Sequence, residues 1–233
     1  MHTINLDAIK LTKNIRLLDA GCGTGRHLTY AKKKGLTQLY GIDLDDSAFP
    51  DIINILNETE LSKPSKTMNT ILKKSNLEAL PFRDDFFDVV ICSEVLEHVV
   101  DVEACLSELY RVLKPEGIAM ISVPRFWPEK LCWFLSDAYH QNEGGHVRIF
   151  TKKKLLKKLK KTAFKPFKFH YAHAFHSPFW WLKCLFWNKK TNIIARYERF
   201  LIRQMYLYSL KTNPIESALN PLLGKSMVFY AKK

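Results

Sequence analysis

The chain has 233 residues, of which 47% are hydrophobic and 25% are charged, and its formal net charge is +13. This balance excludes a disordered or fibrous protein, and the length fits one domain with an elaboration, or at most one and a half ordinary domains. No apolar run approaches the roughly 18 residues of a membrane span. The first seven residues lack the basic-then-apolar order of a signal peptide, so we expect a cytoplasmic protein.

The positive charge has two explanations of equal weight. It would draw the protein toward polyanions such as nucleic acid or acidic lipid headgroups. Alternatively, the many Lys, Asn and Ile residues reflect an AT-rich genome. The five cysteines are an odd number without metal-ligand spacing, so we expect reduced, mostly buried thiols and no metal cluster. They are Cys22, Cys92, Cys105, Cys132 and Cys184.

The first motif is an apolar strand that ends at three alternating glycines. Residues 15–18 are typical of a buried parallel strand, and Gly21, Gly23 and Gly25 follow it. Glycines let the backbone approach a ligand, and the next residues can begin a helix whose free N–H groups face that ligand. A dinucleotide fingerprint would need its third glycine at position 26, which is Arg26. The spacing therefore favours another ligand, or only a tight turn.

Asp19-x-Gly21-x-Gly23-x-Gly25 resembles the first motif of the class I S-adenosylmethionine-dependent methyltransferases. Three later stretches resemble the family too: residues 76–92, the V-L-E-H segment at 95–98, and the run from 106 to 118. His146, Arg148 and Phe150 form an H-x-R-x-F element that is similar to one in relatives of the ubiquinone-biosynthesis methyltransferases. The resemblance covers roughly residues 14 to 170 and implies methyl transfer (EC 2.1.1.-) with S-adenosyl-L-methionine as cofactor.

The resemblance also implies a donor site at the carboxyl ends of the strands. Asp43 ends the predicted strand 38–42, where its carboxylate can accept hydrogen bonds from both ribose hydroxyls. Asn76 stands where the family usually has Asp beside the adenine, and its amide oxygen can still accept a hydrogen bond. Ser93 and Glu94 are expected to line the pocket. The full set of expected cofactor-binding residues is Asp19, Gly21, Cys22, Gly23, Gly25, Asp43, Leu44, Asn76, Leu77, Ser93 and Glu94.

Three residues are expected to act on the methyl acceptor: His98, His146 and Tyr139. His98 either points to the acceptor or, on the first turn of a helix, only hydrogen-bonds a neighbouring carbonyl. The loop after residue 124 is positioned to cover the acceptor, and it holds Tyr139, His140 and His146. Each of these side chains is either an acid, base or acceptor-orienting group, or a partner in loop hydrogen bonding.

The alternating strand and helix signals predict an α/β fold with a Rossmann-like, seven-stranded, mostly parallel sheet and helices on both faces. Strands are expected at 88–92, 118–123, 164–173 and 226–230, after the two near the N-terminus. Residues 114–117 are expected to form the turn that stops the preceding helix. A lysine-dense helix is predicted from Thr151, as its N-cap, to Lys161.

An aromatic-rich helical insertion is expected before the last strand. The predicted domains are a methyltransferase core at 1–173, the insertion at 174–225 and a returning strand at 226–233. Aromatic residues flanked by lysines at 175–190 suit either a helical cap over the substrate or a segment at the interface of an anionic membrane. The two roles are compatible if the acceptor is a lipid.

These patterns predict transfer of a methyl group to an apolar or amphipathic small molecule, such as a quinone precursor, a polyprenoid or a lipid. Peripheral contact with an anionic membrane goes with that prediction. One alternative is an RNA or protein methyltransferase, although the basic residues are spread along the chain and nucleic acid is the less favoured partner. The other is a catalytically silent module that binds a membrane or a protein partner.

Overall fold

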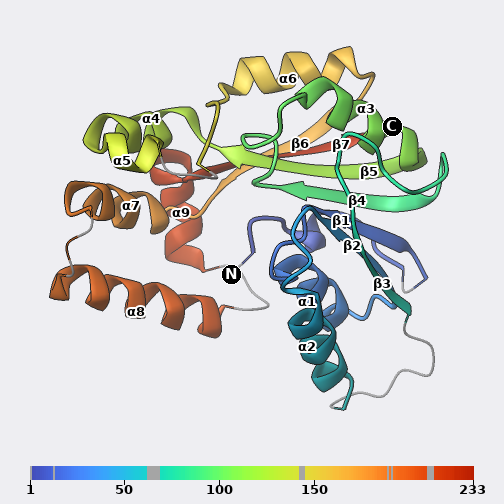
Figure 1. Cartoon of the computed structure of the whole chain (residues 1–233), viewed down its shortest axis with the longest axis horizontal. Coiled ribbons are helices and arrows are strands. Elements are labelled where there is room, and N and C mark those ends of the chain that lie inside the picture. Colours follow the sequence, from blue (N-terminus) through green and yellow to red (C-terminus); the bar gives the residue numbers. More distant parts are fainter. Residues whose placement is uncertain are drawn as a thin grey trace.

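The computed structural model (Figure 1) describes residues 2–12, 14–61, 69–141, 145–187, 189, 191–208 and 213–233. Its strands are β1 (Arg16–Ala20), β2 (Gln38–Asp43), β3 (Asn69–Lys74), β4 (Phe87–Ser93), β5 (Leu113–Pro124), β6 (Lys165–Ala172) and β7 (Ser226–Lys232). They form one seven-stranded sheet in the order β3-β2-β1-β4-β5-β7-β6. Strand β7 is antiparallel to both of its neighbours, and the remaining pairs are parallel. The predicted fold class is confirmed.

Helices cover both faces of this sheet. They are α1 (Arg26–Lys33), α2 (Phe49–Leu61), α3 (Val102–Val112), α4 (Phe126–Leu135), α5 (Asp137–His140), α6 (Lys152–Lys161), α7 (His176–Leu185), α8 (Asn192–Leu207) and α9 (Pro214–Leu223), and a 3₁₀ turn spans Leu6–Ala8. In Figure 1, α3 and α6 lie above the sheet and α1 and α2 lie below it. One apolar core lies on each face because strands covered on both sides are apolar throughout.

Helices α4 and α5 occupy part of the stretch after residue 124 that was expected to be a loop, and strand β3 was not predicted either. Its residues are Asn-Thr-Ile-Leu-Lys-Lys, and it pairs only with β2, at the edge of the sheet. An edge strand leaves one side to solvent and carries polar and charged residues, so its apolar signal is weak. The sequence also predicts a surface loop at 62–65, and these residues lie outside the described ones.

The expected turn at 114–117 is an irregularity inside β5. Leu113 pairs with Phe87 and Ile118 pairs with Val89, so β5 carries extra residues between two paired positions. Glu116 has φ 62°, the left-handed conformation that such a detour requires. Helix α3 therefore ends at Val112, next to an extended Leu113, and the strand begins earlier than predicted.

Residue His98 lies in a turn, and the predicted placement on the first turn of a helix is wrong. Helix α3 begins at Val102, and the Asp101 carboxylate caps it by accepting the N–H groups of Glu103 and Ala104. The preceding carbonyls of Leu96, Val99 and Val100 accept hydrogen bonds from the Arg148 guanidinium. Because these carbonyls face Arg148, they do not form helical hydrogen bonds.

The insertion consists of α7, α8 and α9, beside α4 and α5 (Figure 1). Helix α7 contacts both α4 and α8, and α9 contacts β6. Asn188 and Lys190 of the predicted aromatic segment lie outside the described residues. The Thr151 hydroxyl accepts the Lys154 N–H, which confirms the predicted cap of α6. All five cysteines are free and buried, as expected.

Candidate functional site

The three glycines after β1 all adopt the left-handed conformation, but they meet different surroundings. A Cβ on Gly21 (φ 80°) would lie 2.4 Å from Val95 Cγ2, and one on Gly25 (φ 74°) would lie 2.7 Å from Ile52 Cγ1. A Cβ on Gly23 (φ 49°) would have no atom of the described residues within 4 Å. Packing therefore requires the outer glycines, whereas the middle one borders open space.

Asp43 at the end of β2 closes this turn. Its Oδ2 accepts the Gly23 N–H at 2.7 Å, and its Oδ1 accepts the Asp45 N–H at 3.1 Å. The Ser75 N–H bonds the Asp43 carbonyl at 2.9 Å, which places the neighbouring Asn76 at the same edge. The carboxyl ends of β1, β2 and β3 thus bring together the glycine loop, Asp43, which is expected to bind the ribose, and Asn76, which is expected to contact the adenine.

Asp19 is a buried carboxylate beside the glycine loop. It is fully buried, and within the described part of the chain neither of its oxygens has a hydrogen-bond partner. The closest cation-forming group is His27 Nδ1, at 3.7 Å from Asp19 Oδ1. A buried carboxylate without a donor is costly. A ligand with a cationic or N–H group would relieve this cost, which fits an amino-acid end such as that of S-adenosylmethionine.

The other expected donor residues divide into exposed and buried ones. Leu44 is 62% exposed and Asn76 is exposed, with its Oδ1 accepting the Glu78 N–H at 3.0 Å. Leu77 and Cys22 are buried, and burial raises the pKa of the Cys22 thiol. Leu77 therefore belongs to the core, and Cys22 is an unreactive packing residue.

Ser93 and Glu94 connect the end of β4 to β5. Ser93 Oγ lies 2.9 Å from Ser122 Oγ, and the Ser122 hydroxyl donates to Glu94 Oε1 at 2.8 Å. Glu94 has φ 58°, a strained conformation for a residue with a Cβ. Such strain persists where the surroundings hold a side chain in place, here at the carboxyl edge of the central strands.

A second group of polar residues lies under the insertion and is centred on Glu129 of α4. This carboxylate is fully buried. Its Oε1 accepts the Tyr139 hydroxyl at 2.9 Å and His146 Nδ1–H at 2.6 Å, and its Oε2 accepts Lys225 Nζ at 3.2 Å. We call Glu97, His98, Glu129, Tyr139, His146 and Lys225 the Glu129 cluster. The structure thus brings all three expected acceptor residues together.

Glu129 is ionised in this cluster. Burial by itself would raise its pKa, but the hydrogen bond from His146, the charge of Lys225 and the Tyr139 hydroxyl outweigh burial and lower the pKa of Glu129 to about 2. Burial by itself would lower the pKa of Lys225, but the negative charges of Glu129 and Glu94 outweigh burial and raise it. A buried ion pair of this kind is held by several hydrogen bonds at once.

Glu97 is the other buried carboxylate of this cluster. Burial, reinforced by the charge of Glu94, raises its pKa well above the ordinary value. Its Oε1 lies 4.0 Å from both His98 Nε2 and His146 Nε2. His98 Nδ1 donates to the Gly145 carbonyl at 3.2 Å, which is the carbonyl contact considered from the sequence. The two imidazole rings are 4.9 Å apart.

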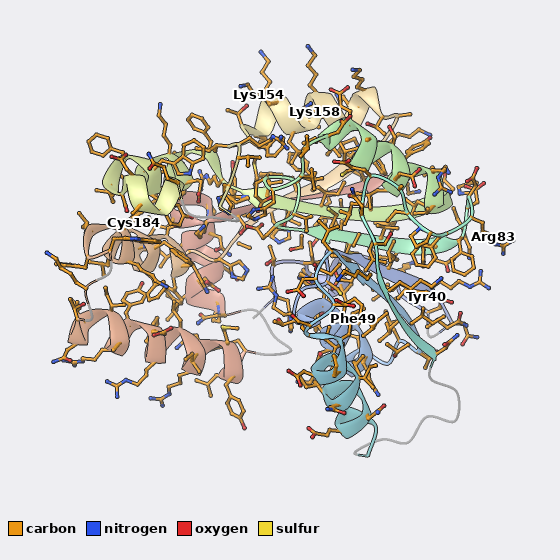
Figure 2. The ribbon with its side chains drawn as sticks, in the orientation of Figure 1. Tyr40, Phe49, Arg83, Lys154, Lys158 and Cys184 are labelled. Atoms are coloured by element: carbon orange, nitrogen blue, oxygen red, sulfur yellow. The ribbon has the colours of Figure 1, made fainter. Side chains whose placement is uncertain are left out.

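Aromatic side chains of the insertion cover the Glu129 cluster. The Tyr139 ring lies 5.6 Å from Trp180 and 5.8 Å from Trp187, and Trp181 Nε1 donates to the Pro128 carbonyl at 3.1 Å. Figure 2 shows Cys184 of α7 on the side near α4 and α5. These aromatic side chains thus pack against α4 and α5. The side chain of His140 lies outside the described residues.

The sequence missed Glu129 and Lys225 as members of the site. Glu129 falls among aromatic residues, and a helical period would have placed it on the same face as Cys132, three residues later. An acidic residue on a buried helix face signals a partnered charge. Lys225 gave no signal, because lysines are frequent throughout this chain.

Comparisons with known proteins agree with the sheet and the glycine loop. Residues 18–121 match the family model described as "Methyltransferase domain". The ubiquinone biosynthesis O-methyltransferase of Rickettsia bellii is 34% identical over 47% of this chain and 42% of its own length. The cycloartenol-C-24-methyltransferase 1 of Oryza sativa subsp. japonica is 29% identical over 58% of this chain and 35% of its own.

A similar fold occurs in the crystal structure of a putative methyltransferase from Bacillus halodurans C-125, with a TM-score of 0.62, 19% identity and coverage of 98% and 96% of the two chains. The chain spans half or less of the two curated relatives named above, so their match describes a shared domain. Within the described residues no helix is long and apolar enough to cross a membrane. Residues 18–121 are thus a methyltransferase domain of the class I S-adenosylmethionine-dependent kind.

Proposed function

We propose that this chain transfers a methyl group from S-adenosylmethionine to an apolar or amphipathic small molecule, such as a quinone precursor, a polyprenoid or a lipid. The observation that carries the proposal is the Glu129 cluster, a buried set of acid and base groups under aromatic side chains. The names of two relatives, a cycloartenol methyltransferase and a ubiquinone biosynthesis methyltransferase, refer to acceptors of this class. Their names support the acceptor class and no single molecule.

On the donor side, backbone and carboxylates do the binding. The open space at Gly23 accommodates the donor, and the Asp43 carboxylate would exchange its Gly23 bond for the ribose hydroxyls. Asp19, whose carboxylate oxygens have no hydrogen-bond partner among the described residues, would receive the positive end of the donor. S-adenosylmethionine supplies a methyl carbon that its sulfonium already activates, so the protein's task is to hold the acceptor in line and to exclude water.

On the acceptor side, His146 can move a proton. Its Nδ1–H is committed to Glu129, so Nε2 is the nitrogen that can accept a proton from a hydroxyl or carbon acid. The ionised Glu129 would stabilise the resulting imidazolium, as the carboxylate of a catalytic triad does. Tyr139 and Lys225 hold Glu129 in place. An amine acceptor would need less of this help.

The donor half of the proposal is tested by calorimetry with S-adenosylhomocysteine. Asp43→Ala removes two hydrogen bonds to a charged group, so we expect about 100-fold weaker binding. The matched control is Asp45→Ala, an exposed aspartate of the same loop whose carboxylate accepts the Ser47 N–H. No binding by the wild type, or equal binding by the Asp43→Ala variant, would contradict the proposal.

The acceptor half is tested with methyl-labelled donor and separate lipid, RNA and protein extracts. Label in the lipid fraction supports the proposal, and label confined to RNA or protein favours the alternative methyltransferases. Donor binding without label in any fraction favours a catalytically silent module. With an active fraction in hand, His146→Gln should lower turnover by about 10²–10⁴-fold for a hydroxyl or carbon acceptor and leave donor binding unchanged.

We also propose that α8 contacts an anionic membrane surface. Arg196, Arg199 and Arg203 are exposed and recur at helical spacing, and the neighbouring Ile202 and Tyr206 are 59% and 83% exposed. Arginines beside exposed apolar residues suit the headgroup boundary, where each basic residue contributes about 1 kcal/mol. This surface would bring a lipid acceptor close to the aromatic cap.

Vesicle sedimentation tests this contact. Changing the three arginines to Gln should reduce binding to phosphatidylglycerol vesicles by about 100-fold. Changing Lys153, Lys154 and Lys157 of α6 removes the same charge from another surface, where Figure 2 shows Lys154 projecting away from the protein. Equal losses in both variants would show nonspecific attraction and would contradict a role for α8.

A further inference from the structure

A second cluster of ligating side chains lies where the insertion leaves and rejoins the sheet. His173 follows the last residue of β6, His176 is the first residue of α7, and Glu216 lies in the first turn of α9. One ligand atom from each lies within 4.8 Å of the others. Glu97, His98 and His146 form a similar group, but they belong to the Glu129 cluster already described.

Two polar atoms of this second cluster are buried without a partner. Glu216 is only 4% exposed, and among the described residues its Oε1 and the Nδ1 of His176 have no hydrogen-bond partner. Leaving such atoms unpaired destabilises the folded protein. An imidazole nitrogen and a carboxylate oxygen that are close together, buried and unpaired indicate a missing ligand that both can bind.

His173 is held in position by its backbone and by a neighbouring hydroxyl. Its φ is 67°, a conformation that residues with a Cβ rarely adopt and that tends to occur at functional sites. Thr3 Oγ1 lies 2.9 Å from His173 Nε2, and the Arg26 guanidinium donates to the same hydroxyl at 3.2 Å. A second hydrogen bond of this kind commonly orients a histidine that binds a metal.

We propose that His173, His176 and Glu216 bind one divalent transition-metal ion, and that zinc is the ion that best fits two imidazoles and one carboxylate. This donor set is borderline in hardness, as zinc prefers, and three protein ligands leave a fourth tetrahedral position for water. The three ligand atoms lie within 4.8 Å of one another, and they would converge on the zinc ion when it binds.

The surroundings supply an entry path. A cavity of about 1020 Å³ borders the cluster and is lined by His2, His170, His173, Glu216 and Asn220 among others. The charges of Arg26 and Lys225 act on His176 and oppose a cation, which the Glu216 carboxylate would offset.

Such an ion would join the first and last helices of the insertion to the edge of the sheet. His173 and His176 are three residues apart, whereas Glu216 comes 40 residues later, after α8. Metal binding to residues this distant contributes to folding free energy. The ion would therefore hold the aromatic cap on the core, away from the reacting groups.

Metal content of the full chain is the first test. After treatment with a chelator and dialysis against zinc chloride, wild type should retain one zinc per chain. Glu216→Gln keeps the size of the side chain and should retain none, as should His176→Ala. His98→Ala removes a member of the other cluster and should retain the zinc. Absence of zinc from the wild type, retention in Glu216→Gln, or loss in His98→Ala would overturn the proposal.

Thermal unfolding gives a second readout that does not depend on methyl transfer. Zinc at about 100 times its dissociation constant should raise the Tm of wild type by about 5–10 °C and leave the Tm of Glu216→Gln unchanged. Circular dichroism shows whether each variant is folded before zinc is added. An equal rise in Tm for wild type and Glu216→Gln would place the zinc elsewhere and contradict the proposal.

Discussion

The glycine turn on the donor side and the Glu129 cluster on the acceptor side are built in opposite ways. The turn uses backbone from one continuous stretch, residues 19–25, and one carboxylate from the next strand. The cluster joins side chains from the turn after β4, from α4, from α5, from the loop before α6 and from the residue before β7. A change at Gly23 or Asp43, which border open space, should therefore affect mainly ligand binding, whereas a change in the cluster should affect the stability of the whole domain.

The two glutamates of the cluster sharpen this comparison. Both Glu97 and Glu129 are fully buried, yet Glu129 has three hydrogen-bond donors and Glu97, among the described residues, has no side-chain hydrogen bond. The pKa values of the two buried carboxyl groups are therefore shifted in opposite directions. The number of donors around a carboxylate decides whether it is ionised.

The largest expected effect follows from breaking the buried ion pair. Glu129→Leu leaves Lys225 buried without a partner, which should lower the free energy of unfolding by about 3–5 kcal/mol in urea titrations. Adding Lys225→Met to this variant should recover most of the loss. The exposed pair Glu116 and Lys232 is the control, because Glu116→Gln should give no resolvable change. Similar losses in both glutamate variants would show that burial of the pair is unimportant.

The same carboxylate predicts an acid-side pH dependence. The pKa of Glu129 is about 2 in the folded protein and near 4.5 when unfolded, so its stabilisation is present above pH 4.5 and is lost as the pH falls toward about 2. Unfolding of wild type and Glu129→Gln is compared between pH 6 and pH 2.5. We expect the difference between their free energies to shrink with falling pH, and a constant difference would contradict an ionised Glu129.

Gly23 and Gly21 separate binding from packing within the turn. Gly23→Ala places a methyl group in open space, so we expect about 10- to 100-fold weaker binding of S-adenosylhomocysteine, with about 1–2 kcal/mol of stability lost to the left-handed backbone. Gly21→Ala would overlap Val95 and should lose about 2–5 kcal/mol. Calorimetry and urea titration on both variants check this, and equal stability losses would contradict it.

The smallest expected effect is that of Glu97→Gln. Because burial raises the pKa of Glu97 well above its ordinary value, an amide of the same shape should change the free energy of unfolding at pH 7 by less than about 1 kcal/mol. Glu129→Gln under the same conditions serves as the comparison and should be clearly less stable. Equal losses for the two glutamines would mean that Glu97 is also ionised.

The sequence predicted the elements whose signals are local. The strand and glycine turn at 15–25, the strand that ends at Asp43, and the capped helix from Thr151 were all found where the residues indicated. Strand β3 was missed because an edge strand needs few apolar residues. His98 was misplaced because Arg148, 50 residues away, binds the carbonyls that a helix would have used.

By itself the sequence determined the fold class, the methyltransferase family and the glycine turn, because each rests on short-range spacing that backbone sterics enforce. Only the tertiary structure decided that Glu129, Lys225 and His146 meet, and that the pKa values of Glu97 and Glu129 are shifted in opposite directions. It also brought His173 and His176 next to Glu216. Burial and hydrogen-bond partners set these properties, and both depend on residues that are far apart in the chain.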